Sequence, residues 1–182
     1  MGAKPEPNML PIETQLQHAG LELLGRCNGL SRHAPKWRHD AVLLEDLTDA
    51  EADALGALMP LVRAQPGQVM IREGDVGDWM LLILSGTVDV TKNSEHGETS
   101  RLAVIQQGAA VGEMSMLDAA PRYATCTAIE EVQAGVLTRQ TIGHLIQEHP
   151  AVGAKLLVKL TQLLAQRLRN TSNQLVRLLQ EK

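Results

Sequence analysis

One short segment of the sequence combines residue types that suit an anion and a sugar. Within residues 108–125, Gly112 and Glu113 are followed, nine positions after the glutamate, by Arg122. Gly112 is expected to end a strand, and a single helical turn should follow until Pro121 stops it. Unpaired backbone N–H groups in such a turn favour an anion, and a guanidinium offers phosphate oxygens a planar, permanently charged fork. Glu113 is itself anionic, so we expect it to accept a hydrogen bond from a sugar hydroxyl.

Each of these residues also has an ordinary structural explanation. A glutamate in the first turn of a helix often only complements the helix dipole. A single arginine before a strand is commonly a surface residue. The functional interpretation therefore depends on the combination and its spacing.

That combination resembles the phosphate-binding cassette of cyclic nucleotide-binding domains. The cassette has Gly-Glu, a short apolar turn, and then Pro-Arg followed by a small residue, Ala, and Thr or Ser. Gly112-Glu113 and Pro121-Arg122-Tyr123-Ala124-Thr125 fit this order. The surrounding glycines at positions 67, 74, 86 and 108 fit the family as well, and the resemblance covers residues 44–180.

The resemblance implies a role for each cassette residue. Glu113 would hold the ribose 2′-hydroxyl, and Arg122 would hold the cyclic phosphate. Backbone N–H groups near Met114, Ser115 and Ala124 would bind the remaining phosphate oxygens.

Tyr123 departs from the family pattern, which has a small residue at that place. Two arrangements are open from the sequence. The ring either points away from the pocket or narrows it, and in the second case the identity of the ligand changes.

The last part of the chain is expected to be one long helix. After Gly153 it contains neither Gly nor Pro, and about 30 residues at 1.5 Å each give a rod of roughly 45 Å. Its apolar residues recur at heptad spacing, with threonines at two further positions: Leu157, Thr161, Leu164, Leu168, Thr171, Leu175 and Leu178. A lone helix cannot bury such a stripe, so we predict a parallel homodimer through this helix.

Residues 165–172 of this helix resemble the dimer helix of the bacterial cyclic-AMP receptor proteins. There a Thr-Ser pair meets the adenine, the Thr from the same subunit and the Ser from its partner. Thr171 and Ser172 fall on that pair. The alternative is that Thr171 is only a tolerated polar residue in the dimer seam.

The elements that must position these residues are mainly strands. From residue 61 to residue 139, short alternating runs such as Val88 and Val90 lie beside recurring glycines. Short strands with a turn signal every 8–12 residues are typical of a sandwich or barrel. Thr48 and Glu51 form a capping box before a helix over 49–59. The predicted fold is mainly β with flanking helices: a β-barrel or jelly-roll domain over 44–150, followed by the long dimerisation helix over 151–182.

Residues 1–43 are predicted to be an extension, partly helical or mobile. Its helix signal lies over Ile12–Leu24 and is only moderately periodic. A role in docking to a partner is one interpretation of this part of the chain.

Composition and motifs argue against several functional classes of protein. The net charge is −4, and the part of the chain over 41–150 is strongly acidic, so we expect no direct binding to nucleic acid. The two cysteines, Cys27 and Cys126, form neither a metal motif nor a disulfide framework, and a reduced, cytoplasmic setting fits best. No signal peptide, membrane span or catalytic motif is recognised, so we expect no enzyme, no cofactor and no membrane contact.

Together these observations predict a homodimeric sensor of cyclic AMP that signals to an effector protein and carries no DNA-binding domain. Cyclic GMP or a cyclic dinucleotide stays open as the ligand. Two alternatives also stay open: the ligand-binding part of a cyclic-AMP-responsive transcription regulator, and a structural relative that binds no nucleotide.

Overall fold

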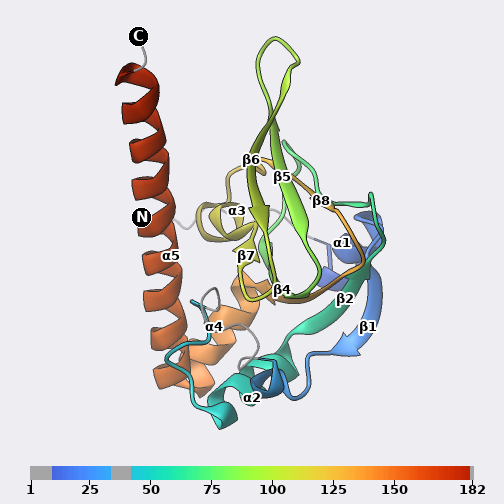
Figure 1. The fold of residues 1–182 in the computed structure, drawn as a ribbon. Helices are drawn as coiled ribbons and strands as arrows, with labels where there is room; N and C mark the ends of the chain where they lie inside the picture. The colour runs from blue at the N-terminus through green and yellow to red at the C-terminus, as the bar shows by residue number, and fades with distance from the viewer. Residues whose placement is uncertain (1–9, 34–41, 181–182) are drawn as a thin grey trace, which may run out of the picture.

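Two antiparallel sheets form the centre of the computed structural model, which describes residues 10–33 and 42–180 (Figure 1). The five-stranded sheet has the order β1 (Glu22–Arg26), β2 (Pro60–Ala64), β9 (Val132–Thr138), β4 (Trp79–Ser85), β7 (Ala110–Val111). The four-stranded sheet has the order β3 (Val69–Ile71), β8 (Thr125–Ala128), β5 (Val88–Asn93), β6 (Thr99–Ile105). The predicted jelly-roll is confirmed, but the sheets do not join into a closed barrel, because β1, β7, β3 and β6 are edge strands.

The central strand β4 shows how the sequence divides the core in two. Its side chains alternate between the faces of the sheet, as strand geometry requires. Trp79, Leu81 and Ile83 pack between the two sheets. Met80, Leu82 and Leu84 pack on the other face, against the helices. A continuous apolar run in the sequence is therefore explained by burial on both faces.

Several helices join or cover these sheets. The α-helices that follow β1 in the described residues are α2 (Asp49–Leu58), α3 (Glu113–Asp118), α4 (Arg139–Glu148) and α5 (Pro150–Gln180). The predicted capping box of α2 is present, since the Thr48 hydroxyl accepts from Glu51 N and Glu51 Oε2 accepts from Thr48 N.

The long helix α5 changes its surroundings along its length. Val152, Leu156 and Leu160 are buried in the helix-side core. Beyond residue 164 the helix extends beside the β5–β6 hairpin (Figure 1), and its leucines are exposed; Leu168 is 69% exposed. The first half of α5 therefore anchors the helix, and the second half presents an uncovered apolar stripe.

The amino-terminal part differs from the expectation. The helix α1 (Ile12–His18) stops before Gly20, whose φ of +72° suits a left-handed turn, and β1 then pairs antiparallel with β2. Leu16 and Leu21 are buried between the sheets. A further helical turn, η1 (Leu30–Arg32), packs Leu30 into the helix-side core. Residues 10–33 thus pack into the fold and are helical in part. The predicted helix over Ile12–Leu24 is too long, because Glu22–Leu24 belong to β1, where pairing with β2 outweighs weak helical periodicity. The rest of the predicted extension, residues 1–9 and 34–41, lies outside the described residues.

Candidate functional site

The turn after β7 forms as its sequence predicts. Gly112, at φ +83°, ends the strand and begins α3, which an alanine or larger residue would do only with backbone strain. The turn ends at Ala119, which also adopts the left-handed conformation at φ 60°. Glu113 is thereby placed at the first position of α3, with its side chain directed inward and 0% exposed.

The carboxylate of Glu113 has one occupied oxygen and one free oxygen. Oε1 accepts a hydrogen bond from Arg167 Nη1 of α5. Arg167 Nη2 donates to the carbonyl oxygen of Ala110 at 2.6 Å, so the guanidinium bridges α5 to the cassette. Oε2 is buried and has no hydrogen-bond partner among the described residues. A buried acceptor without a hydrogen bond costs free energy, and a ligand hydroxyl could donate the missing hydrogen bond to Oε2.

The guanidinium of Arg122 is held from several sides. It is 4% exposed, and Nη1 donates to the carbonyl oxygens of Trp79 at 2.7 Å and Gly112 at 3.0 Å. Its Cζ lies 4.5 Å from the centre of the Trp79 ring. Burial lowers the pKa of Arg122 to about 10, so the group stays charged at neutral pH. Nη2 is buried without a partner in the part of the chain that the structure describes.

Both residues line one cavity of about 680 Å³ between the cassette, β6 and α5. Eight of the nine residues predicted from the sequence lie on its wall: Gly112, Glu113, Met114, Ser115, Arg122, Tyr123, Ala124 and Thr171. Ser172 is exposed on α5 and is not on this wall. The structure therefore brings the cassette and Thr171 together around one space, although they lie far apart in the sequence.

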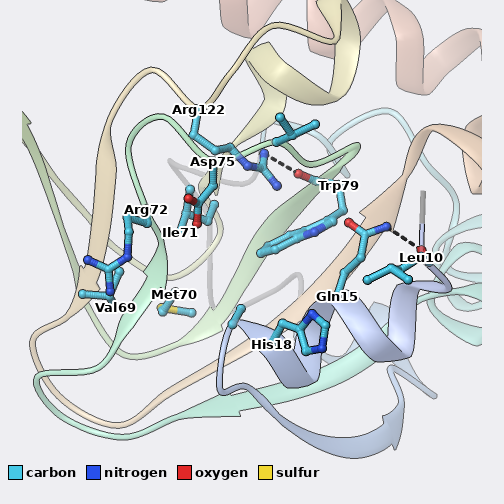
Figure 2. Close-up of a pocket in the computed structure, with 12 residues that line it drawn as sticks. Leu10, Gln15, His18, Val69, Met70, Ile71, Arg72, Asp75, Trp79 and Arg122 are labelled. Carbon is cyan, nitrogen blue, oxygen red and sulfur yellow. Dashed lines mark hydrogen bonds between the residues drawn. The ribbon is translucent and has the colours of Figure 1, made fainter. Parts of the chain in front are cut away.

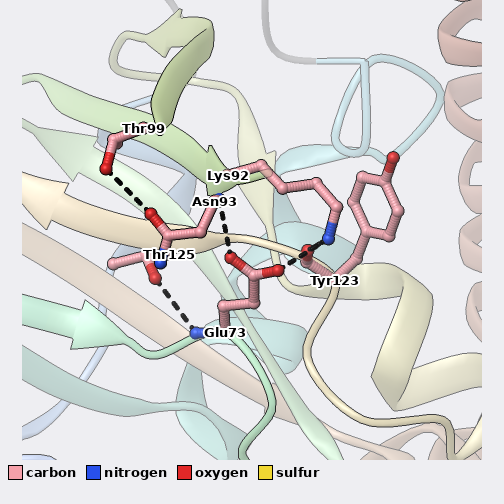
Figure 3. A network of polar contacts seen from close by, with 6 residues as sticks. All are labelled: Glu73, Lys92, Asn93, Thr99, Tyr123 and Thr125. Atoms are coloured by element: carbon pink, nitrogen blue, oxygen red, sulfur yellow. Dashed lines mark hydrogen bonds and ion pairs between the residues drawn. The ribbon is translucent and has the colours of Figure 1, made fainter. Parts of the chain in front are cut away.

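Tyr123 is held at the rim of the cavity. Its ring is 4.2 Å from the Lys92 ammonium, and the residue is 53% exposed. Lys92 Nζ also donates to Glu73 Oε1 at 2.7 Å and to the carbonyl oxygen of Tyr123 at 2.8 Å (Figure 3). The ring thus lines the mouth beside a cation rather than filling the interior.

Arg167 is the main site residue that sequence reasoning missed. A signal existed, because Arg167 lies four positions before Thr171 and so shares its face of the helix. Leu164 and Leu168, which the heptad pattern assigned to a dimer seam, also line the cavity. Further wall residues come from β5, β6 and α5: Val90, Leu102, Ala103, Ile105, Asn170 and Gln174.

Arg122 also lines a second, smaller cavity. Its volume is about 450 Å³, and it lies against α1 and the ring of Trp79 (Figure 2). Polar residues around it include Gln15, His18 and Asp75. Arg122 therefore lines both cavities, and a shift of its guanidinium would change the wall of each.

Two other kinds of site receive no support from the described residues. Residues 10–33 and 42–180 hold no cluster of three or more His, Cys, Asp or Glu suited to a metal ion. None of the helices in the same ranges is long and apolar enough to cross a membrane.

Comparison with known proteins agrees with this geometry. Residues 61–149 match the family model of the cyclic nucleotide-binding domain. A cyclic nucleotide-binding domain from Methylobacillus flagellatus is 30% identical, with a TM-score of 0.77 over 86% of this chain and 88% of that one. The Thermus thermophilus catabolite activator protein is 29% identical, with a TM-score of 0.69 over 75% of this chain and 62% of that one.

Among curated proteins, a CRP-like cAMP-activated global transcriptional regulator from Mycobacterium tuberculosis is 32% identical over 113 residues. The match covers 62% of this chain and 49% of that regulator. The chain thus spans about half the length of this relative.

Proposed function

The chain belongs to the family of cyclic nucleotide-binding domains, and we propose that it is a sensor of cyclic AMP. The observation that carries this proposal is the pair of buried groups of opposite charge on one cavity wall. Arg122 Nη2 and Glu113 Oε2 each lack a partner among the described residues. A cyclic nucleotide has the complementary groups, an anionic phosphate and a ribose hydroxyl.

The charges around the cavity favour an anionic ligand. Arg122 and Arg167 contribute two positive charges against the single negative charge of Glu113. Burial also raises the pKa of the Cys126 thiol on the same wall to about 12, so this thiol stays neutral and does not repel a phosphate. Local geometry can therefore recruit an anion to a domain that is acidic over residues 41–150.

The wall contributed by α5 supports a purine base. Thr171, Asn170 and Gln174 add hydroxyl and amide groups, and Leu164 and Leu168 add apolar surface. A hydroxyl both donates and accepts, which suits the amino group and N1 edge of adenine. We propose that Thr171 contacts adenine in the same subunit and that Ser172, exposed on α5, contacts adenine in a partner subunit.

The proposed output is a protein contact made by a homodimer. Leu175, Leu178 and Leu179 are exposed on the second half of α5, where a second copy of the helix could cover them. Ligand binding against α5 would change how the two helices meet. The alternative is the ligand-binding part of a longer DNA-binding regulator, which the half-length match to the mycobacterial relative favours. Intact-mass measurement of the native gene product separates the two.

The test of ligand binding is calorimetry with cyclic AMP on the wild type and Arg122→Ala. A charge-assisted hydrogen bond contributes about 1.5–3 kcal/mol, so the variant should bind about 10- to 100-fold more weakly. Arg169→Ala is the matched control, since Arg169 is exposed on α5 and does not line the cavity. Equal affinity of Arg122→Ala and the wild type would contradict the role of Arg122.

A panel with cyclic GMP and cyclic dinucleotides tests the identity of the ligand. Stabilisation by cyclic AMP at lower concentration than by the others supports the proposal. A wild-type protein stabilised by none of them would instead be a structural relative that binds no nucleotide. Thr171→Val should weaken binding of cyclic AMP but not of ribose cyclic phosphate, and an unchanged affinity for cyclic AMP would show that the hydroxyl is idle.

A further inference from the structure

Gly77 lies where a side chain would collide with the guanidinium of Arg122. It lies in the loop between β3 and β4, outside the cassette. A Cβ atom built on Gly77 would lie 2.6 Å from Arg122 Nη2, 3.1 Å from Cζ and 3.2 Å from Nε. Non-bonded heavy atoms pack at about 3.5–4.0 Å, so the guanidinium occupies the place that any side chain at position 77 would need.

The backbone does not require glycine at this position. Gly77 is not among the glycines with positive φ, so an alanine can adopt its conformation. Gly112 differs in this respect. A Cβ there would lie 3.0 Å from Arg122 Nη1, but it would also lie 2.8 Å from Ile71 Cδ1, on a backbone at φ +83°. A substitution at Gly77 therefore tests the steric contact with Arg122 without adding the backbone strain of a positive φ.

The loop around Gly77 is fixed on both sides. Gly74 N donates to the carbonyl oxygen of Arg122 at 2.9 Å, and Arg122 N donates to that of Asp75 at 2.8 Å. After Gly77, Arg139 N donates to the carbonyl oxygen of Asp78 at 3.1 Å. A methyl group at position 77 would therefore displace the guanidinium, which side-chain hydrogen bonds hold, more easily than the loop, which backbone hydrogen bonds fix at both ends.

We propose that Gly77 is a positioning residue for nucleotide binding, whose lack of a side chain keeps the Arg122 guanidinium at the cavity wall. This inference rests on the proposed function, in which Arg122 holds the phosphate. A side chain at position 77 would then move the charged group away from the ligand. That movement would also weaken the hydrogen bonds that Arg122 Nη1 donates to the carbonyl oxygens of Trp79 and Gly112.

The experiment is a double-mutant cycle of Gly77→Ala and Arg122→Ala, read by calorimetry with cyclic AMP. Gly77→Ala alone should weaken binding about 10-fold or more, as expected for a displaced charge-assisted contact. In the Arg122→Ala background it should have no further effect, because the group it displaces is gone. Gly143→Ala is the control, since a Cβ at Gly143 meets no atom within 4 Å, and it should bind as the wild type does.

Two results overturn the proposal while leaving the proposed function in place. One is wild-type affinity of Gly77→Ala when Arg122→Ala has lost affinity. The other is an equal loss from Gly77→Ala in both backgrounds, which would show a structural effect independent of Arg122. Wild-type affinity of Arg122→Ala would instead refute the proposed phosphate contact itself.

Thermal unfolding without nucleotide gives a second measurement of the same contact. Gly77→Ala should lower the unfolding midpoint of the protein that has Arg122 and not that of Arg122→Ala. If Gly77→Ala does not fold, the double variant should fold again, because the space is vacated. A double variant that also fails to fold would overturn the proposal.

Discussion

Replacing Arg167 by methionine tests the ion pair that joins α5 to the cassette. The variant keeps most of the side-chain length but leaves the Glu113 carboxylate buried without its charged partner. Removing one partner of a fully buried pair costs about 3–5 kcal/mol. The Arg167 side chain is 36% exposed, so water screens the pair in part. We therefore expect Arg167→Met to lower the free energy of unfolding by about 1–3 kcal/mol.

The assay is urea unfolding at neutral pH without nucleotide. Arg169→Met is the matched control, because Arg169 is exposed two positions further along α5 and is expected to change stability by less than about 0.5 kcal/mol. Glu113→Gln should recover part of the loss when combined with Arg167→Met, since the uncompensated charge is then removed. A free energy of unfolding equal to that of Arg169→Met would refute the reasoning, as would a double variant less stable than the sum of the single changes.

Three further results are expected. Thr48→Ala should lower the free energy of unfolding by about 1 kcal/mol in urea, because the capping box of α2 is lost; an unchanged urea midpoint would show that the box contributes nothing. Leu168→Asp combined with Leu175→Asp should convert a dimer to a monomer in light scattering, and a dimer that persists would place the interface elsewhere. The hydrogen bond from Lys155 is the main cause that lowers the pKa of Glu51 from its ordinary value of 4.5. The ionised Glu51 therefore stabilises the fold at pH values above 4.5, and this stabilisation is lost as the pH falls through the lowered pKa. Lys155→Met should therefore be less stable than wild type at neutral pH and approach it in acid, and a difference that stays constant down to low pH would contradict this origin.

Local patterns in the sequence determined much of the architecture and the cassette. The turn from Gly112 into α3, the capping box at Thr48 and the long helix α5 were predictable, because each depends on residues within a few positions of one another. Regular alternation and recurrent glycines also indicated the sheets. The resemblance to a known cassette predicted that Glu113 and Arg122 share one site, and both line one cavity.

Tertiary structure alone decided the contacts between distant parts of the chain. Arg167 contacts Glu113, which lies 54 positions earlier in the sequence. Gly77 lies beside Arg122, although it belongs to the loop between β3 and β4, which no local pattern connects to the cassette. The strand β1 exists because β2 supplies its hydrogen bonds, which outweigh the weak helical periodicity over Ile12–Leu24. Local propensity is encoded in neighbouring residues, whereas pairing, burial and the shared use of one guanidinium arise only when the chain brings separate segments to the same place.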